Sequence, residues 1–594
     1  MKVSWQKWCF HLPLVQHLKS YNLKALRSDL KAGLNVSLLD FPQGMAYAMI
    51  AGLPVQFGIY ASAIGSTIGP LFASSRYLML GPTNASAVLL LSAFLVLDVS
   101  DEQRLVVLPL LIIMVSAFLF LGVFLQAHVI LQYVSRSVVV GYITAAACLI
   151  IVNQLRHVLG IEVPRSGTFW EALILTGARL LEANQETIFL SLFTIGLYLL
   201  CKFFFKKLPA IAVALVLAGV VYYALNAKGL ELQTLPPLPL ASWPVSLPEI
   251  GFSLISQLAS PAFAIAFLTL LESSSIAKTL AAKSGDRLDV KQQMFSMGAA
   301  NFCNAFASGM PVSGSLTRSI VNFESGAKTP IASMISGGIL VAGVLTLGPL
   351  IGYIPKAALA TLVLVVGVSL FQYKTIKTVV LTTRSDMVTF LVTFLGGLFF
   401  PLDMAIYLGV GTSLILFIKK VSKPSIVEYA FDEQGALGER NKASSDRPAI
   451  SIVHVEGDLF FGATDLFLEE MRRMVLVPHL KVMILRLRNA RNLDASAALA
   501  IIELVHLAKE EGRSVLVSGV HKEVEQVFIQ SGLMKLIGSE NVFHYTPQNL
   551  TMSTRNALKR AQEIIGRDDA DIILLTQRKD NKRSRVSKSD RESH

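Results

Sequence analysis

Two short stretches of the sequence combine a proline with hydroxyl and amide side chains in otherwise apolar surroundings. Residues 81–86 read Gly-Pro-Thr-Asn-Ala-Ser, and residues 309–315 read Gly-Met-Pro-Val-Ser-Gly-Ser. Proline followed by Asn or Ser is typical of the first turn of a helix, where backbone N–H groups lack partners. Such a turn attracts anions, because the free N–H groups and the positive end of the helix dipole point at the ligand. The side chains that can add donors there are Asn84, Ser86, Ser315 and Thr317.

Two charged residues lie in apolar stretches and are costly in a bilayer unless they face a cavity or a partner. Arg318 closely follows the second turn. It is interpreted as a permanent positive charge beside the anion, as a structural pair with a carboxylate, or as a side chain that extends to the inner membrane surface. Glu272 lies in a long apolar stretch. It is interpreted as a proton carrier coupled to the anion, as a cation ligand, or as a fixed partner of Arg318.

The two stretches mark an internal repeat. Pro82 and Pro311 are 229 residues apart, and Gln43 and Glu272 each precede their proline by 39 residues. Seven apolar spans separate the halves, so the second half is inverted relative to the first. Inverted halves with short, proline-marked spans are typical of transporters whose binding site lies at the membrane midplane. Gln43 and Tyr47, one turn apart, either line that cavity or form hydrogen bonds between helices.

The composition indicates a membrane protein. Hydrophobic residues make up 53% of the chain and charged residues 16%, against about 25% in soluble domains. A spanning helix needs about 20 apolar residues. About fourteen candidate spans follow, near residues 30–52, 54–73, 83–97, 105–126, 128–159, 187–202, 208–225, 252–281, 291–308, 313–323, 329–349, 356–373, 385–400 and 402–420.

The net charge of +12 belongs to basic loops between these spans and not to one basic stripe, so we expect no nucleic acid partner. Lys and Arg concentrate in alternate loops, which places both termini in the cytoplasm. The predicted domains are a cytoplasmic N-terminal segment (1–29), a transmembrane anion transport domain (30–422), a linker (423–446), a soluble α/β domain (447–547) and a C-terminal tail (548–594), basic and disordered at its end.

The soluble domain is predicted from alternating strands and helices, with strands near residues 451–455, 482–487, 514–518 and 542–543. Asp494, Ala495 and Ser496 form an exposed turn at the start of the middle helix. Ser496 is interpreted as a phosphorylation or partner site, or as a simple helix cap. The sequence has no GxSxG elbow, HExxH motif or Walker A loop, so we expect neither an enzyme nor a metal site, and no cofactor beyond a coupling H+ or Na+.

Several motifs together resemble the SulP family of sulfate permeases and anion exchangers. They are the stretches 42–54 (PQGMAYAMIAGLP), 81–83 (GPT), 311–319 (PVSGSLTRS) and 321–330 (VNFESGAKTP). The resemblance implies fourteen spans in two inverted seven-span repeats, as in uracil permeases, with a core moving past a gate like an elevator. It implies a homodimer in the plasma (inner) membrane and a C-terminal STAS domain open to a cytosolic protein partner.

By this resemblance the anion site is lined by Gln43, Tyr47, Thr83, Asn84, Ala85, Ser86, Leu316, Thr317 and Arg318. Glu272 aligns with an acidic position associated with proton or sodium coupling. The turn at Ser496 keeps the serine of the STAS phosphorylation motif and lacks its glycine, which puts phosphorylation in doubt.

We therefore expect a secondary active transporter of sulfate, bicarbonate or chloride. The alternatives are an anion channel or voltage-responsive motor, a nucleobase or dicarboxylate permease of the same fold, and a membrane-anchored signalling protein.

Overall fold

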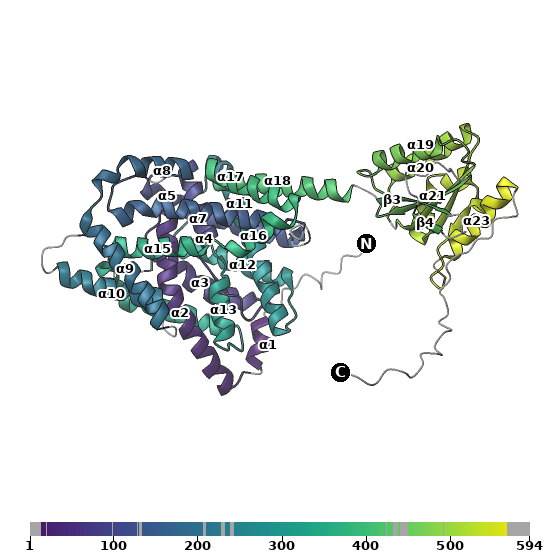
Figure 1. The fold of residues 1–594 in the computed structure, drawn as a ribbon. Helices are drawn as coiled ribbons and strands as arrows, with labels where there is room; N and C mark the ends of the chain where they lie inside the picture. The colour runs from purple at the N-terminus through teal and green to yellow at the C-terminus, as the bar shows by residue number, and fades with distance from the viewer. Residues whose placement is uncertain are drawn as a thin grey trace, which may run out of the picture. The chain divides into compact units, whose positions relative to one another are not determined.

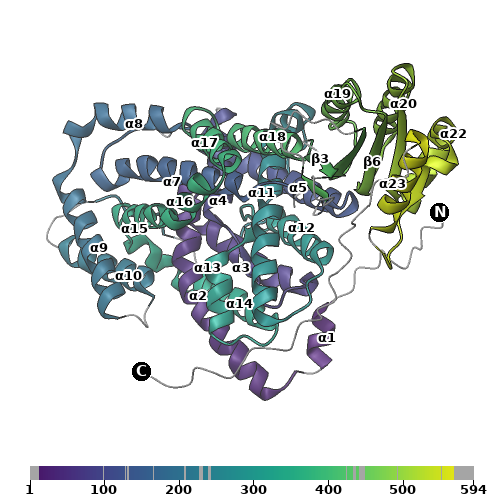
Figure 2. The same cartoon turned by 45° about the vertical axis from the view of Figure 1, so that its right-hand side comes forward.

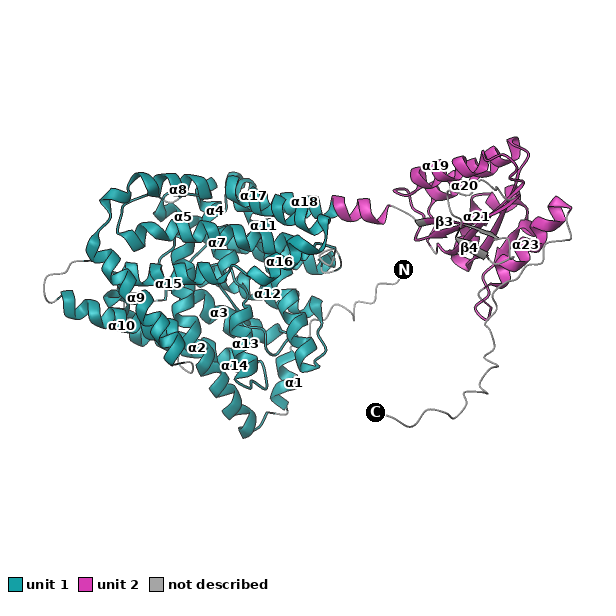
Figure 3. Ribbon diagram, viewed as in Figure 1, with its two compact units in different colours: residues 1–414 teal, residues 415–594 magenta. Residues whose placement is uncertain are grey.

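The structure is a computed structural model, and the chain separates into two compact units, residues 1–414 and 415–594 (Figure 3). It describes residues 13–19, 21–97, 99–127, 129, 133–164, 166–205, 209–226, 232–237, 243–422, 425–431, 437–439, 449–490, 492–549 and 551–566. The first unit is helical, and the second combines a sheet with helices (Figure 1).

Each of the fourteen predicted spans corresponds to a helix. In the first half these are α2 (Leu23–Ala51), α3 (Gln56–Phe72), α4 (Asn84–Val96), α5 (Asp101–Phe124), α7 (Arg136–Leu159), α9 (Gln185–Phe204) and α10 (Ala210–Asn226). In the second half they are α11 (Phe252–Ser284), α12 (Val290–Phe306), α13 (Leu316–Glu324), α14 (Ile331–Leu347), α15 (Lys356–Ser369), α17 (Arg384–Phe399) and α18 (Leu402–Val421). Within the described residues of the first unit, three α-helices were not predicted: α1 (Pro13–Lys19), α8 (Phe169–Ala178) and α16 (Tyr373–Thr382).

Length and composition make seven of the described helical segments able to cross a membrane. The remaining predicted spans are 17 residues or shorter, apart from α2. At 1.5 Å per residue, the 13 residues of α4 and the 9 of α13 are too short for a hydrocarbon layer of about 30 Å. Both short spans are therefore half-helices, as the sequence predicts.

The helix packing repeats itself when the halves are exchanged. When each helix is replaced by its counterpart in the other half, the packed pair α5–α12 becomes α14–α3, and α5–α11 becomes α14–α2. The pair α4–α11 likewise becomes α13–α2, and all of these pairs are packed in the structure. The pairs α7–α17 and α15–α9 match in the same way. The two seven-span repeats are thus interleaved, which confirms the predicted fold.

The helices form two bundles. We call α2–α5 with α11–α14 the core bundle, and α7–α10 with α15–α18 the gate bundle. Fewer helix pairs pack between the bundles, namely α2–α10, α2–α15 and α4–α7. Figures 1 and 2 show α9 and α10 side by side at the edge of the unit, and α4 in its middle beside α7 and α11.

The predicted repeat offset of 229 residues is wrong by about one helical turn. The first residues of α4 and α13 are 232 apart, and the ends of α2 and α11 are 233 apart. The error arises because the prolines are not equivalent. Pro82 follows the strand β1 (Leu80–Gly81), whereas Pro311 precedes its counterpart β2 (Ser313–Gly314). At an offset of 233, the residue that corresponds to Asp40 is Ser273.

The second unit contains a six-stranded sheet of order β4-β3-β5-β6-β7-β8, in which β5 to β8 are parallel. Helices α19 (Thr464–Val475), α20 (Ala495–Glu510), α21 (Lys522–Gln530) and α22 (Leu533–Ile537) pack on one face, and α23 (Met552–Ile565) on the other. The strands predicted from alternation are β5 (Ile450–Glu456), β6 (Val482–Asn489), β7 (Ser514–Val520) and β8 (Val542–His544).

Three boundaries drawn from the sequence are corrected. The segment 423–446 is not a linker throughout, because β3 (Ser425–Phe431) pairs with β5, and β4 (Leu437–Glu439) pairs with β3. Residues 548–594 are not all tail, because α23 buries Ala557, Leu558 and Ala561 against the sheet. Helix α2 begins inside the segment 1–29. The basic end of the tail lies outside the described residues.

Candidate anion site

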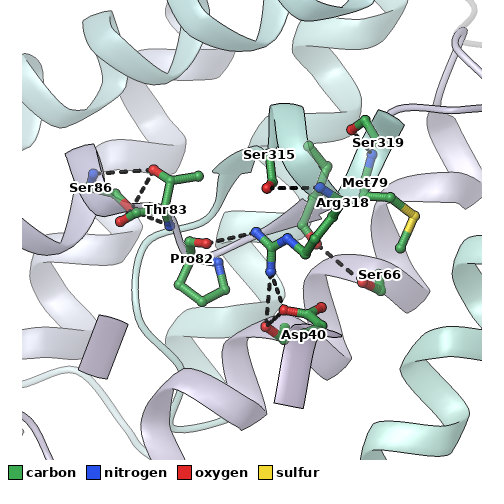
Figure 4. Close-up of polar contacts among 11 residues, drawn as sticks. Asp40, Ser66, Met79, Pro82, Thr83, Ser86, Ser315, Arg318 and Ser319 are labelled. Carbon is green, nitrogen blue, oxygen red and sulfur yellow. Dashed lines mark hydrogen bonds and ion pairs between the residues drawn. The ribbon is translucent and has the colours of Figure 1, made fainter. Parts of the chain in front are cut away.

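The first turn of α4 is closed by its own side chains. Thr83 is the N-cap, and its hydroxyl accepts the backbone N–H of Ser86, while the Ser86 hydroxyl accepts the N–H of Thr83 at 3.0 Å (Figure 4). This capping box uses the hydroxyl of Ser86, one of the two side-chain donors predicted for this turn, and leaves Asn84 outside it. The N–H groups of Asn84 and Ala85 have no acceptor inside the helix, because an α-helix leaves its first N–H groups unpaired.

The first turn of α13 has the same form. Ser315 is the N-cap, with its hydroxyl facing the N–H of Arg318, and the backbone N–H groups of Leu316 and Thr317 lie in the exposed first turn. The side chains of Leu316 and Thr317 are exposed, with Leu316 at 45%. An anion would therefore meet backbone N–H groups in this turn, with the Thr317 hydroxyl beside them.

Two short strands bring the half-helices together. β1 pairs antiparallel with β2, with Leu80 opposite Gly314 and Gly81 opposite Ser313. The strands lead directly into α4 and α13, so the two N-termini meet at this pairing. The predicted convergence of residues 83–86 and 315–318 on one place is therefore observed.

Buried side chains hold β2 in position. Ser273 on α11 accepts the N–H of Gly314 at 2.7 Å, and Asn301 on α12 exchanges two 2.9 Å hydrogen bonds with the backbone of Val312. Ser319 on α13 accepts the N–H of Met79 at 2.9 Å (Figure 4). These bonds hold the site rigidly within the core bundle.

One interpretation of Arg318 is a permanent positive charge beside the anion. The structure shows a different environment for this side chain. Its side chain is wholly buried and forms an ion pair with Asp40 of α2, which is wholly buried too (Figure 4). The guanidinium also donates to the Pro82 carbonyl at 2.7 Å and to the Ser62 hydroxyl at 3.2 Å. A buried arginine needs such partners, so its charge is neutralised within the protein.

Asp40 is the site residue that the sequence reasoning missed. The carboxylate partner considered for Arg318 was Glu272, and the structure places Asp40 there instead. The signal was present, since Asp40 is an acidic residue one turn before Gln43 in an apolar span. The pair joins α2, α13 and the segment before α4, and thus both repeats.

Gln43 and Tyr47 lie on α2 beside this pair, and both are buried. The side-chain oxygens of Gln43 and Asn84 are buried and accept no hydrogen bond within the described residues. Buried polar groups are normally satisfied, so these two oxygens are available to a hydrogen-bond donor such as water. Tyr47 lies within electrostatic range of Asp40, Arg318 and Glu272.

Glu272 precedes Ser273, the residue that holds β2, and its side chain is partly buried. It lies within electrostatic range of Tyr47 and of Tyr142 on α7. The predicted anion-site and ion-coupling residues therefore lie on the two helices α2 and α11 and on the two half-helices α4 and α13. Among the residues that the structure describes, no group of three His, Cys, Asp or Glu side chains lies close enough to hold a metal ion.

Ser496 lies apart, in the second unit, where it is exposed in the first turn of α20. It is not the helix cap, because Asp494 caps α20 through the N–H of Ala497 at 2.9 Å. The second carboxylate oxygen of Asp494 accepts the N–H of Phe461 at 2.7 Å. The regulatory role of Ser496 stays a prediction.

A polytopic helical unit with interleaved repeats, a site built on two half-helices and an attached α/β domain together define an anion transporter. The model of the sulfate permease family matches residues 26–393, and that of the STAS domain matches residues 442–548. The chain belongs to the sulfate permease family and carries a C-terminal STAS domain. It is a multi-pass membrane protein and not an enzyme.

Similar proteins carry transporter names. The chain is 28% identical to the probable sulfate transporter 4.2 of Arabidopsis thaliana, covering 87% of this chain and 79% of that protein. It is 24% identical to a putative sulfate transporter of Bacillus subtilis, covering 89% and 98%. The murine Solute Carrier 26 family member A9 anion transporter, solved in the inward-facing state, shares the fold with a TM-score of 0.85, at 20% identity over 95% of this chain and 96% of that chain.

Proposed function

We propose that the protein is a secondary active transporter that takes up or exchanges a small oxyanion, sulfate or bicarbonate, or chloride. The anion binds between the first turns of α4 and α13. H+ or Na+ is the coupling ion, and Glu272 is its carrier. The observation that carries the proposal is the pairing of β1 with β2, which brings two helix N-termini to one place inside the membrane unit.

The binding chemistry is supplied mainly by the backbone. The N–H groups of Asn84, Ala85, Leu316 and Thr317 offer donors from two sides, and Gln43 and Tyr47 add polar side chains from α2. Since Arg318 is neutralised by Asp40, the site carries little fixed positive charge. A site with little fixed positive charge suits a small anion that must be released again after it has bound.

Elevator-type alternating access is supported by the two bundles. The core bundle is fastened across the repeats by polar contacts. Asp29 on α2 accepts the N–H of Lys328 at 2.6 Å and the Thr329 hydroxyl at 2.6 Å, and Arg76 donates to Asp286 at 2.8 Å. These hydrogen bonds from Arg76 lower the pKa of the Asp286 carboxyl. A bundle braced in this way moves as one body past the gate bundle.

Transport is tested with purified protein in proteoliposomes, measuring uptake of labelled sulfate and of labelled bicarbonate, each in competition with the other and with chloride. We expect saturable uptake of at least one of them. Absence of saturable uptake of labelled sulfate, bicarbonate and, in a third assay, labelled chloride would refute the proposal. Competition by dicarboxylates above that by sulfate would favour a dicarboxylate permease, and ion currents far above transporter turnover would favour a channel.

Coupling is tested with Glu272→Gln under an imposed pH gradient and, separately, a Na+ gradient. We expect the gradient-driven part of uptake to disappear while exchange without a gradient continues. Glu324→Gln, at the exposed end of α13, is the matched control and keeps the gradient response. An unchanged gradient response in Glu272→Gln would exclude this residue as the carrier.

We further propose that the protein is a homodimer of the plasma (inner) membrane with both termini cytoplasmic, and that the STAS domain meets a cytosolic protein. The exposed Lys419 and Lys420 at the end of α18 support this orientation. Protease digestion of sealed inside-out vesicles tests it, because a cytoplasmic STAS domain is then cleaved without detergent.

A further inference from the structure

One fully buried tyrosine connects the gate bundle to the anion site. Tyr142 on α7 has no exposed surface, and its hydroxyl donates to the carbonyl oxygen of Ala85 at 2.9 Å. Ala85 is the second residue of α4, so this hydrogen bond ends on the turn whose N–H groups face the anion. Neither the repeat nor the family motifs singled out Tyr142.

Two further groups of hydrogen bonds cross between the bundles. The N–H of Leu402, where α18 begins, donates to Ser92 on α4 at 3.3 Å. Tyr407 on α18 donates to the carbonyl oxygen of Ser260 on α11 at 2.7 Å, and the Ser260 hydroxyl donates to Asp403 at 3.1 Å. All of them connect α4 or α11 of the core bundle to α7 or α18 of the gate bundle.

We propose that Tyr142 is a positioning residue for transport, which fastens the first turn of α4 to the gate bundle in this conformation and releases it when the core bundle moves. Tyr407 on α18 of the gate bundle fastens α11 of the core bundle in the same way. This inference rests on the proposed movement of one bundle past the other.

The reason is geometric. A hydrogen bond within one bundle survives a rigid movement of that bundle, whereas a bond between bundles breaks. Ala85 belongs to the anion site, so the Tyr142 bond holds the site itself and not a remote surface. Removing the hydroxyl destabilises only the conformation in which the bond exists, and it shifts the population toward the other conformation.

The first experiment tests the movement alone. Cysteines replace Ser260 and Asp403, whose side chains are in contact, after Cys9, Cys148, Cys201 and Cys303 have been replaced by serine. Oxidation then joins α11 to α18. We expect anion uptake to stop on oxidation and to return on reduction. Full uptake by the cross-linked protein would refute the bundle movement, and with it this inference.

The second experiment tests the tyrosine. Tyr142→Phe removes one hydroxyl and keeps the ring, and we measure the rate of disulfide formation in the cysteine pair, the maximal uptake rate and the half-saturating anion concentration. We expect disulfide formation to slow by roughly two- to tenfold, the effect of one hydrogen bond on a population. The maximal uptake rate should change by more than the half-saturating concentration does.

Tyr222→Phe is the matched control, since the buried Tyr222 on α10 donates to the carbonyl oxygen of Leu232, in the segment that follows α10, at 3.2 Å and not to the core bundle. We expect it to leave the disulfide rate unchanged. Equal effects of Tyr142→Phe and Tyr222→Phe, or no effect of Tyr142→Phe while the cross-link still blocks uptake, would overturn the role of Tyr142 and leave the bundle movement standing. If Tyr142→Phe does not fold, the maximal uptake rate of Tyr407→Phe provides the same comparison.

Discussion

At the scale of single residues, the structure separates charge from anion binding. Arg318 is the most basic group near the site, yet Asp40, Ser62 and the Pro82 carbonyl use its donors inside the protein. One carboxylate oxygen of Asp40 has no hydrogen-bond partner among the described residues. Arg318 therefore holds α13 against α2 and the segment before α4, and anion binding by the backbone N–H groups is the proposal made above.

Replacing Asp40 by Asn should leave the buried Arg318 charge without its counter-charge. Because a broken buried pair costs about 3–5 kcal/mol, the melting temperature of the purified protein should fall. Added sulfate should then stabilise Asp40→Asn more than it stabilises the unchanged protein, because the freed guanidinium attracts an anion.

The double variant Asp40→Asn/Arg318→Gln provides the check on that prediction. Its loss of stability should be smaller than the sum of the losses of the two single variants, since neither charge is left unpaired. Strictly additive losses would show that the two residues do not act as a pair.

At the scale of elements, the critical feature is the close approach of β1 and β2. A Cβ atom on Gly81 would lie 2.5 Å from an Arg318 guanidinium nitrogen, and one on Gly314 would lie 2.9 Å from the Ser273 hydroxyl. The two glycines are equivalent at an offset of 233. The pairing therefore requires a glycine at one position of each strand, Gly81 next to Arg318 and Gly314 next to Ser273.

Gly81→Ala should displace the Arg318 guanidinium and separate the two half-helices. We expect a loss of stability of about 1–3 kcal/mol from overpacking, together with weaker anion binding, both measured by thermal unfolding with and without sulfate. Gly338→Ala in α14 is the control, because no atom lies within 4 Å of its added Cβ. A Gly81→Ala protein with normal stability and anion response would contradict the requirement for a glycine.

At the scale of the whole molecule, the two units fold in different solvents and respond differently to pH. His454 on β5 is buried, and burial, reinforced by the nearby Arg486, lowers the pKa of its imidazole. Its folded pKa is thus below its unfolded pKa of about 6.5. The resulting stability is present above that unfolded pKa and is lost as the pH falls below it, since the unfolded state then binds the proton first.

The STAS domain should accordingly unfold at lower urea concentration at pH 5.5 than at pH 7.5, and His454→Gln should reduce this difference. The measurement is urea-dependent proteolysis of the full chain, followed through fragments of the STAS domain. His506→Gln, an exposed residue of α20, is the control and should keep the difference. If His454→Gln shows the same difference in urea stability between the two pH values, other titrating groups cause that difference.

Much of this architecture follows from hydropathy and periodicity, because long apolar runs and alternating strands have strong signals. The position of the site followed from two short spans with polar first turns. The partner of Arg318 could not be predicted from the sequence, because two residues separated by 278 positions leave no local pattern. The strand β3 and the helix α23 were missed for a related reason, since β3 joins the sheet by pairing with β5 and α23 by packing on β6 and β7, and neither tertiary contact leaves a pattern within the element itself.

The predicted repeat offset was wrong because matching residue types, and not matching strands and helices, determined it. Pro82 and Pro311 match in the sequence, yet they lie on opposite sides of their strands. Only the strand register and the helix ends show which residues are equivalent, and both depend on tertiary contacts.

The pairing of Leu80 with Gly314 also determines the order of events during synthesis. When the first repeat leaves the ribosome, β1 lacks its partner strand and Asp40 lacks the Arg318 charge, and both of these partners are more than 200 residues away in the chain. At about 5–20 residues per second, the wait is on the order of ten to fifty seconds. For that time only the Ser62 hydroxyl of the same repeat can donate to the Asp40 carboxylate, and the counter-charge arrives with the second repeat.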